Sequence, residues 1–321
     1  MSAAPTWKRA ATLLWIAGVV GFVAYEAREV DWDAVVRVVR GYGWGALAIA
    51  GLLVAPGYLA CASYDLVGRH CTGHRIPWAR TTAISFVGYC FSLNLGALVG
   101  GLAFRYRLYA SSGLSPWRIG QVIALSVVTN WSGYVVLAGL LLALAPPDLP
   151  SSWRVPASML RACGFAFLAT AALYLGACLL KGGRRIRWRG RELVLPGIGI
   201  AGVQLALSLV SWGAIGAAIA WLMPGDISWL DVMPVVLTSA VAGVLSHVPG
   251  GLGVIEAVFA AMLGHEVERS QLLGALLAFR TVYYLVPLAV AVAVFTGLEA
   301  TARGRVGVSR PLERNAVAPD R

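Results

Sequence analysis

The sequence has little charge and no long polar stretch. Only 13% of its 321 residues are charged, 59% are hydrophobic, and the mean hydropathy is +0.74. This composition excludes a soluble globular domain and is typical of an integral membrane protein. Polar residues are confined to short loops and a basic tail over residues 301–321. We therefore expect a single all-α polytopic membrane domain over residues 1–321.

Signatures of catalysis, nucleotide binding and metal binding are also missing. The sequence contains no Gly-x-x-x-x-Gly-Lys-[Ser/Thr] phosphate loop and no His-Glu-x-x-His zinc motif. Its five cysteines lack metal-ligand spacing, and nothing completes the small group of Cys71, His70 and His74. We therefore expect no metal, no cofactor and no enzymatic activity. The net charge of +11 indicates cytoplasmic loops that face anionic lipid, so no nucleic-acid partner is expected.

Apolar residues gather in eight segments. Lys8 and Arg9 precede the first one as in a signal peptide, but Ala24–Ala27 is a poor cleavage match, so an uncleaved helix is expected. A helix needs about 20 residues to cross the bilayer core. The segments are Ala10–Tyr25, Trp44–Tyr64, Thr81–Phe104, Ile119–Ala145, Met159–Leu180, Leu195–Met223, Val232–Gly264 and Leu272–Leu298.

The seventh segment contains Ser246-His-Val-Pro-Gly-Gly-Leu-Gly-Val-Ile-Glu256, which disfavours a continuous helix. Proline removes a backbone donor and glycine is a poor helix former. The runs before and after the break, Val232–Leu245 and Val254–Gly264, are each too short to cross the membrane. Broken backbone at membrane depth must be buried in protein or line a wet cavity. We predict two short helices that form a re-entrant hairpin with a Pro-Gly-Gly tip.

The distribution of basic residues predicts the topology. If Lys181–Arg191 and the C-terminal tail are cytoplasmic, Val232–Gly264 enters and leaves the membrane on the same face. Thr81–Phe104, interrupted by Ser92-Leu-Asn-Leu-Gly96 and by Gly100-Gly101, either spans the membrane or forms a second re-entrant hairpin. The second arrangement places both termini in the cytoplasm and is preferred. It gives about six spanning helices and two hairpins, with halves 1–146 and 157–300 as an inverted repeat.

Three motifs resemble the lysylphosphatidylglycerol synthetase transmembrane-region family, the flippase portion of the bacterial multiple peptide resistance factor. They are Ser92-Leu-Asn-Leu-Gly96 with Gly100-Gly101 and Arg105-Tyr-Arg-Leu-Tyr109, Ser246–Glu256, and Arg280-Thr-Val-Tyr-Tyr-Leu-Val-Pro287. The resemblance covers nearly the whole chain and implies a bacterial inner-membrane protein that moves phospholipid, often aminoacylated phosphatidylglycerol, between leaflets. Full-length members also carry a soluble aminoacyl-transfer domain. Because this sequence ends soon after its last apolar segment, synthesis of lysyl-lipid is not expected.

Candidate substrate-binding residues lie at the two interrupted segments and at polar positions in other apolar runs. Half-helix N-termini and glycine backbone suit a lipid phosphate, although glycines also let helices pack closely. The candidates are Asn94, Gly96, Gly100, Gly101, Arg105, Tyr106, Arg107, Asn130, Ser246, His247, Pro249, Gly250, Gly251, Gly253, Glu256, Arg280, Tyr283 and Tyr284.

Several candidates have an alternative structural role. Arg105 and Arg107 either hold a lipid phosphate or anchor the chain at the cytoplasmic face. For Arg280, a buried ion pair with Glu256 that fixes the hairpin is preferred over lipid contact. Packing is preferred for Tyr283, Tyr284 and His247, and interhelical hydrogen bonding competes with path lining for Asn94 and Asn130. Asp65 is expected to end a helix at the interface.

The expected function is lipid translocation without nucleotide hydrolysis, with membrane phospholipids as partners. One alternative is a membrane scaffold for a separate lipid synthase. The other is an intramembrane enzyme that modifies headgroups, which the absence of a nucleophile and base arrangement disfavours.

Overall fold

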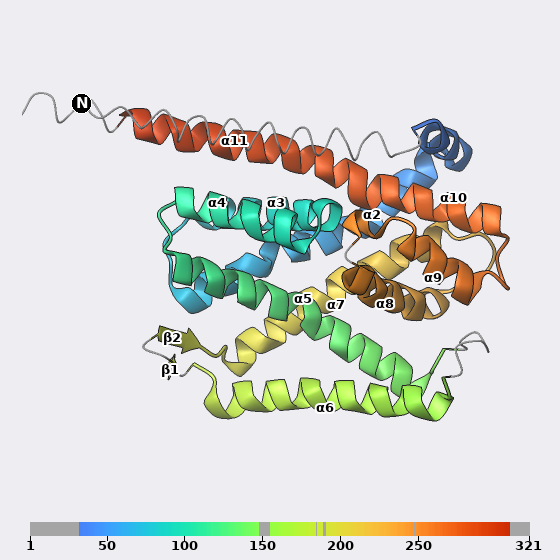
Figure 1. Cartoon of the computed structure of the whole chain (residues 1–321), viewed down its shortest axis with the longest axis horizontal. Coiled ribbons are helices and arrows are strands. Elements are labelled where there is room, and N and C mark those ends of the chain that lie inside the picture. Colours follow the sequence, from blue (N-terminus) through green and yellow to red (C-terminus); the bar gives the residue numbers. More distant parts are fainter. Residues whose placement is uncertain (1–31, 148–154, 184, 189–190, 247, 309–321) are drawn as a thin grey trace, which may run out of the picture.

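The computed structural model describes residues 32–147, 155–183, 185–188, 191–246 and 248–308 (Figure 1). Six helices in these ranges are long and apolar enough to cross a membrane. They cover Arg40–Thr72, Pro116–Leu144, Ala157–Lys181, Ile198–Leu222, Trp229–Ser246 and Arg269–Thr301. The expected all-α polytopic fold is confirmed. The predicted first helix, Ala10–Tyr25, lies outside the described residues.

Three long helices form the centre of the molecule. Helix α2 (Trp32–Thr72) packs along α7 (Ile198–Leu222), and α5 (Pro116–Leu144) contacts both. Side chains fasten one end of the α2–α7 pair, where the Tyr42 hydroxyl donates to the Leu222 carbonyl at 2.8 Å. Helix α6 (Ala157–Lys181) packs on α5 at one edge of the molecule and otherwise faces outward (Figure 1). The buried surfaces of α2, α5 and α7 thus form a core that supports the broken helices.

Helix α2 extends further than its apolar run predicts. The expected apolar segment ended at Tyr64, with Asp65 at the end of the helix, but the helix continues to Thr72. This expectation is wrong because the first turn beyond Tyr64 packs inside the protein: Asp65 is 0% exposed and Val67 5% exposed. Asp65 therefore lies inside the packed helices and not at a helix end in the interface.

Hairpin one consists of α3 (Trp78–Leu95), the π-helix η1 (Ala97–Ala103) and α4 (Phe104–Ser111). The chain leaves helical geometry at Gly96, where φ is 84° and ψ is 156°, a conformation open to glycine. The returning segment η1–α4 packs back on α3. The stacked rings of Phe91 and Phe104, with centroids 4.2 Å apart, join the two arms.

Hairpin two consists of α8 (Trp229–Ser246), the short 3-10 helix η3 (Pro249–Gly251) and α9 (Val254–Leu263), and α9 packs back on α8. The predicted helix break is confirmed. Helix α8 is longer than its apolar run because Trp229, Leu230 and Asp231 form its first turn, so it reaches a length that permits spanning. Whether either hairpin is re-entrant stays a prediction, as do the inverted halves 1–146 and 157–300.

The last described residues form a long, locally widened helix. Helix α10 (Arg269–Arg280), the π-helix η4 (Thr281–Leu285) and α11 (Val286–Val308) follow one another without a turn. Helix α11 lies along α3, on the opposite side of the molecule from α6 (Figure 1). Phe295 of α11 packs against the rings of Phe91 and Phe104. Hairpin one is therefore enclosed between α2 and α11.

The basic stretch Lys181–Arg191, expected to be a loop, contains part of a small antiparallel ribbon. Strand β1 (Arg185–Trp188) pairs with β2 (Arg191–Val194), and Arg185 lies opposite Val194. The ribbon connects α6 to α7.

Candidate functional site

One side of the break in hairpin two, which we call its outer side, is exposed at the surface of the structure. Gly250, Gly251 and Gly253 all have positive φ, at 63°, 58° and 76°. Ser246 and Gly253 are exposed, as are Val248 at 37% and Leu252 at 43%. Helix α9 starts without a side-chain cap. The break therefore presents backbone that packed side chains do not seal.

The inner side of the same break is held by Arg280. Its Nε donates to Glu256 Oε1 at 2.6 Å, and its Nη2 donates to Oε2 at 3.0 Å. Its Nη1 and Nη2 also donate to the carbonyls of Gly250 at 2.9 Å and Gly251 at 3.0 Å. The fork geometry of a guanidinium allows this bidentate pairing with a carboxylate. Every nitrogen of the side chain is used to fix hairpin two, as the preferred interpretation predicted.

The two helix breaks lie next to each other. A Cβ placed on Gly250 would lie 4.0 Å from the backbone oxygen of Asn94 and 3.9 Å from Arg280 Nη1. Asn94 is in the last turn of α3, and its side-chain amide donates to the Cys90 carbonyl at 2.8 Å. The last turn of α3 and the segment η3 are therefore in contact, and the structure brings together Asn94, Gly250 and Arg280.

The turn of hairpin one lies at Gly96, and Gly100 and Gly101 do not form its tip. Both are buried in η1, which packs against α3. A Cβ on Gly100 would collide with the backbone carbonyl of Phe91, and one on Gly101 would lie 2.9 Å from Ser92 Oγ. Close packing of the two arms thus explains these two glycines.

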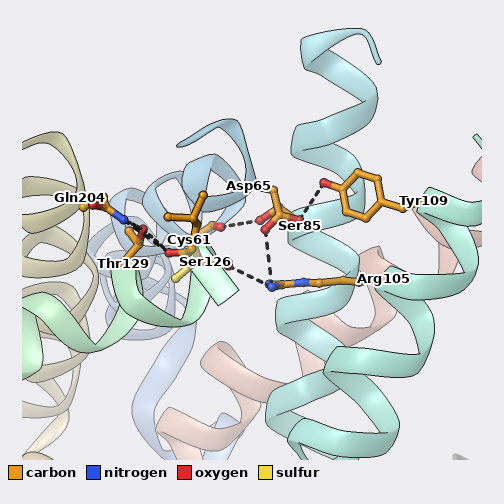
Figure 2. A network of polar contacts seen from close by, with 9 residues as sticks. Cys61, Asp65, Ser85, Arg105, Tyr109, Ser126, Thr129 and Gln204 are labelled. Carbon is orange, nitrogen blue, oxygen red and sulfur yellow. Dashed lines mark hydrogen bonds and ion pairs between the residues drawn. The ribbon is translucent and has the colours of Figure 1, made fainter. Parts of the chain in front are cut away.

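Arg105 is buried and faces protein groups. Its Nη1 donates to Ser126 Oγ at 2.9 Å and lies 3.5 Å from Asp65 Oδ1 (Figure 2). The Tyr109 hydroxyl donates to Asp65 Oδ2 at 2.8 Å. Gly88 provides the space for the arginine, because a Cβ there would collide with the Arg105 side chain. We call Asp65, Arg105, Tyr109 and Ser126 the Asp65 cluster.

The side chains of Arg107 and Tyr106, also on α4, do not take part in the Asp65 cluster. Arg107 forms a bidentate ion pair with Glu299 of α11, with distances of 2.8 Å and 3.1 Å. Tyr106 is 44% exposed. The arginine thus ties the end of hairpin one to the last helix.

The aromatic candidates belong to the core between α2, α3 and η4. Tyr283 is 3% exposed, its carbonyl accepts from the Tyr58 hydroxyl at 2.6 Å, and its hydroxyl lies 2.9 Å from that of Tyr89. The Tyr284 ring lies beneath the Arg280 guanidinium, whose Cζ is 5.4 Å from the ring centroid. Packing, the preferred interpretation, agrees with these contacts.

Of the four remaining candidates, two make hydrogen bonds within the protein and two cannot be placed. Asn130 contributes its backbone carbonyl, which accepts from Ser208 Oγ at 2.6 Å and Trp212 Nε1 at 2.9 Å. The Ser246 hydroxyl donates to the Gly243 carbonyl at 3.0 Å. His247 and the side chain of Pro249 lie outside the described residues.

Sequence reasoning missed Asp65, Gly88, Ser126 and Glu299. For Asp65 a signal was available, since Leu66 and Val67 continue the apolar pattern of the helix beyond it. Ser126 and Glu299 offered none, because their partners lie 21 and 192 residues away in the chain.

The six apolar helices and the two adjacent helix breaks define a polytopic membrane protein with irregular backbone inside its helical region. The sequence matches the family model of the lysylphosphatidylglycerol synthase transmembrane region over residues 10–291, so the chain belongs to this family.

Two relatives cover most of the chain. "Inner membrane protein YbhN" of Escherichia coli K12 is 39% identical over 305 residues, which is 93% of this chain and 95% of the relative. "Uncharacterized protein slr0712" of Synechocystis is 32% identical over 274 residues, 84% of each chain. The protein is therefore a multi-pass inner-membrane protein.

Proposed function

We propose that this protein moves a phospholipid with an anionic or aminoacylated headgroup between the leaflets of the inner membrane. The observation that carries the proposal is the break at Ser246–Gly253, whose outer side is exposed while Arg280 fixes its inner side. Exposed broken backbone is not tolerated in contact with lipid tails. A polar headgroup is a natural partner for it.

The chemistry of the break suits a phosphate. Moving a charged headgroup through the bilayer core is costly because isolated charge is poorly solvated there. Helix α9 begins at the break after the exposed Gly253 and without a side-chain cap, so the backbone N–H groups of its first turn have no capping side chain. A helix N-terminus favours an anion. The break can therefore replace part of the hydration that the headgroup loses.

The contact between the two breaks supports a re-entrant arrangement. We propose that both hairpins enter the membrane, from opposite faces, and meet near its middle at Asn94 and Gly250. A lipid could then be passed from one leaflet to the other along a short path over the two breaks. The family name supports a lipid-related role, and the proposal extends it to translocation.

A leaflet assay tests the function. The purified full chain is reconstituted in vesicles with fluorescent phosphatidylglycerol or its lysyl derivative, and a membrane-impermeant quencher reports the outer leaflet. Wild type is expected to equilibrate the label between leaflets faster than empty vesicles. A folded protein that moves neither lipid would overturn the proposal, and a chemically altered lipid would establish a headgroup enzyme instead.

A matched pair of glycine substitutions ties the activity to the break. Gly253→Ala places a side chain at a φ of 76°, which costs about 1–2 kcal/mol in local geometry and should slow transport about tenfold. Gly243→Ala adds the same methyl group in the last turn of α8, where φ is helical and a Cβ meets nothing within 4 Å. Its transport rate should equal that of wild type. Equal transport rates for both variants would show that transport does not depend on the break.

A further inference from the structure

Buried polar atoms without hydrogen-bond partners gather where α2, α3 and α4 meet. In the described part of the chain there are seven such side-chain atoms, and five lie here. They are Asp65 Oδ1, His74 Nδ1 and Nε2, Thr81 Oγ1 and Arg105 Nε. An unpaired buried polar group costs about 1–3 kcal/mol. Their concentration at one junction indicates a functional role for it.

The Asp65 carboxylate is only half satisfied. Oδ2 accepts from the Tyr109 hydroxyl, but Oδ1 accepts no hydrogen bond from any described residue. The nearest cationic atom, Arg105 Nη1, is 3.5 Å away and donates to Ser126 instead. An ionised carboxylate can accept about four hydrogen bonds. Asp65, which is 0% exposed, therefore has one carboxylate oxygen without a hydrogen bond in the described structure, beside an arginine that donates to Ser126.

The surroundings of Asp65 favour a proton over other ligands. An anion is repelled by the carboxylate, and a metal cation is repelled by the adjacent guanidinium. No group of three His, Cys, Asp or Glu residues that could hold a metal occurs among the described residues. A proton needs no coordination shell and fits a site with no exposed surface.

The charged and titratable groups around Asp65 come from few elements. Helix α4 contributes Arg105 and Tyr109, and the loop after α2 contributes His74, whose ring lies edge-on to Tyr109 with centroids 6.0 Å apart. Helices α3, α5 and α7 face this part of α2 with hydroxyl groups, those of Ser85, Ser126 and Ser211.

The loop histidine does not add a second positive charge near neutral pH. Burial is the main cause that lowers the pKa of His74, and the positive charge of Arg69 adds to it, while Asp65 acts in the opposite direction. The charge of Arg118 at the start of α5 lowers the pKa of His74 further. Arg105 is thus the main counter-charge of Asp65.

We propose that Asp65 is a proton-binding site that couples a proton gradient to movement of hairpin one; the lipid cargo rests on the function proposed above. In the described structure Arg105, on the arm that returns from Gly96, neutralises the carboxylate. If this arm withdraws, a buried carboxylate without a counter-charge is costly and takes a proton on Oδ1. When Arg105 returns, the proton leaves. Proton binding and arm position therefore affect each other equally.

Infrared difference spectroscopy tests the site without any transport. The full chain in nanodiscs is compared between about pH 7 and about pH 5, where exposed Asp and Glu stay largely ionised. Wild type should gain the C=O band of a protonated, water-excluded carboxyl group. Asp65→Asn, which keeps the side-chain size, should lose this band, and Asp226→Asn, at an exposed acid, should keep it. A band that persists in Asp65→Asn would overturn the proposal.

Ser126→Ala provides a second variant in case Asp65→Asn does not fold. It leaves both charges in place and removes the hydroxyl that holds Arg105 Nη1. The arginine can then turn fully to Asp65, so the carboxyl band at about pH 5 should weaken severalfold. An unchanged band would contradict the proposed competition between Ser126 and Asp65.

The leaflet assay under an imposed pH gradient tests the coupling. With one proton per lipid, a gradient of about one pH unit should bias the steady-state leaflet ratio up to about tenfold. Asp65→Asn should give no bias. A leaflet ratio that is independent of the pH gradient, or that depends on a sodium gradient, would contradict proton coupling. The proposed lipid function would remain. If the infrared spectra show the Asp65-dependent carboxyl band but no lipid moves in the leaflet assay, the proton site is supported and the proposed lipid function is contradicted.

Discussion

The two ion pairs that contain the most buried arginine of each broken hairpin site, Arg105–Asp65 and Arg280–Glu256, differ in how completely they are satisfied. Arg280 uses every guanidinium nitrogen, on both oxygens of Glu256 and on two backbone carbonyls of the break. Among the described residues, Arg105 makes one hydrogen bond, to Ser126, and approaches Asp65 only to 3.5 Å. A saturated pair resists movement because every contact would be lost at once. The Arg105–Asp65 pair, which we call half-used because part of its hydrogen-bonding capacity has no described partner, can rearrange at lower cost.

Burial makes the contrast sharper. The half-used pair is the more deeply buried one, with side-chain exposures of 8% for Arg105 and 0% for Asp65, against 11% and 24% for Arg280 and Glu256. A pair that served stability alone would be expected to be most complete where it is most buried. The opposite pattern suggests that hairpin two is a fixed platform and that hairpin one is the element that responds.

The largest effect is expected from loss of the Arg280 contacts. Arg280→Ala leaves Glu256 and the carbonyls of Gly250 and Gly251 without their donor. The free energy of unfolding should fall by about 3 kcal/mol, the low end for a buried pair, because Glu256 is 24% exposed. Chemical unfolding in detergent measures this.

Two variants control the Arg280 measurement. Arg280→Lys should recover only part of the stability because an ammonium lacks the fork. Arg118→Ala, at an exposed arginine, should change stability by less than about 0.5 kcal/mol. If Arg280→Ala keeps full stability and loses transport, Arg280 acts on the lipid and hairpin two is not a fixed platform.

The next largest effect is expected at the tight contact within hairpin one. Gly100→Ala drives a methyl group into the backbone of Phe91, which cannot move without shifting α3, so a loss of about 2–3 kcal/mol is expected. Gly101→Ala meets the Ser92 side chain at 2.9 Å, and because that side chain can rotate the loss should stay under about 1 kcal/mol. Thermal unfolding of the two variants compares them. Equal losses would mean that the two arms are not closely packed.

Composition and helix-breaking residues made the class of fold and the second break predictable. Pro249 with three nearby glycines marks a break in any helix, and Arg280 within an apolar run requires a partner, for which Glu256 was the nearest acid in the adjacent hairpin. The contact between Asn94 and Gly250 could not be predicted, because it depends on how two distant hairpins pack.

The Asp65 cluster illustrates why local patterns fail at buried polar sites. Asp65 follows an apolar run, and a charge in that place usually marks the end of a membrane helix. Here Arg105, 40 positions later in the chain, supplies a counter-charge that lets the helix continue with the acid inside. Nothing in the sequence indicates the role of Gly88, although the absence of a side chain there creates the space for Arg105.

A smaller effect is expected when this space is filled. Gly88→Ala should shift the Arg105 side chain and change its distance from Asp65 without breaking the pair, because a Cβ there would meet the arginine side chain, including its Cδ at 2.8 Å. Since that side chain is flexible, stability should fall by only about 1 kcal/mol. The leaflet bias under a pH gradient should be reduced. Gly213→Ala, where a Cβ meets nothing within 4 Å, should change neither. A normal bias in Gly88→Ala would show that the placement of Arg105 does not matter for coupling.

The smallest effect concerns the dependence of stability on pH beside hairpin one. Burial, and then Arg69, lower the pKa of His74, so the unfolded chain binds the proton more tightly than the folded protein. Stability from the neutral ring is complete above the unfolded value of about 6.5 and is lost as the pH falls from there through the lowered folded pKa. His74→Phe, which keeps a ring against Tyr109, should therefore flatten the fall of the melting temperature between about pH 7 and about pH 5. His265→Phe, at an exposed histidine, should leave the wild-type slope. An unchanged slope in His74→Phe would place the acid sensitivity at groups other than this buried ring.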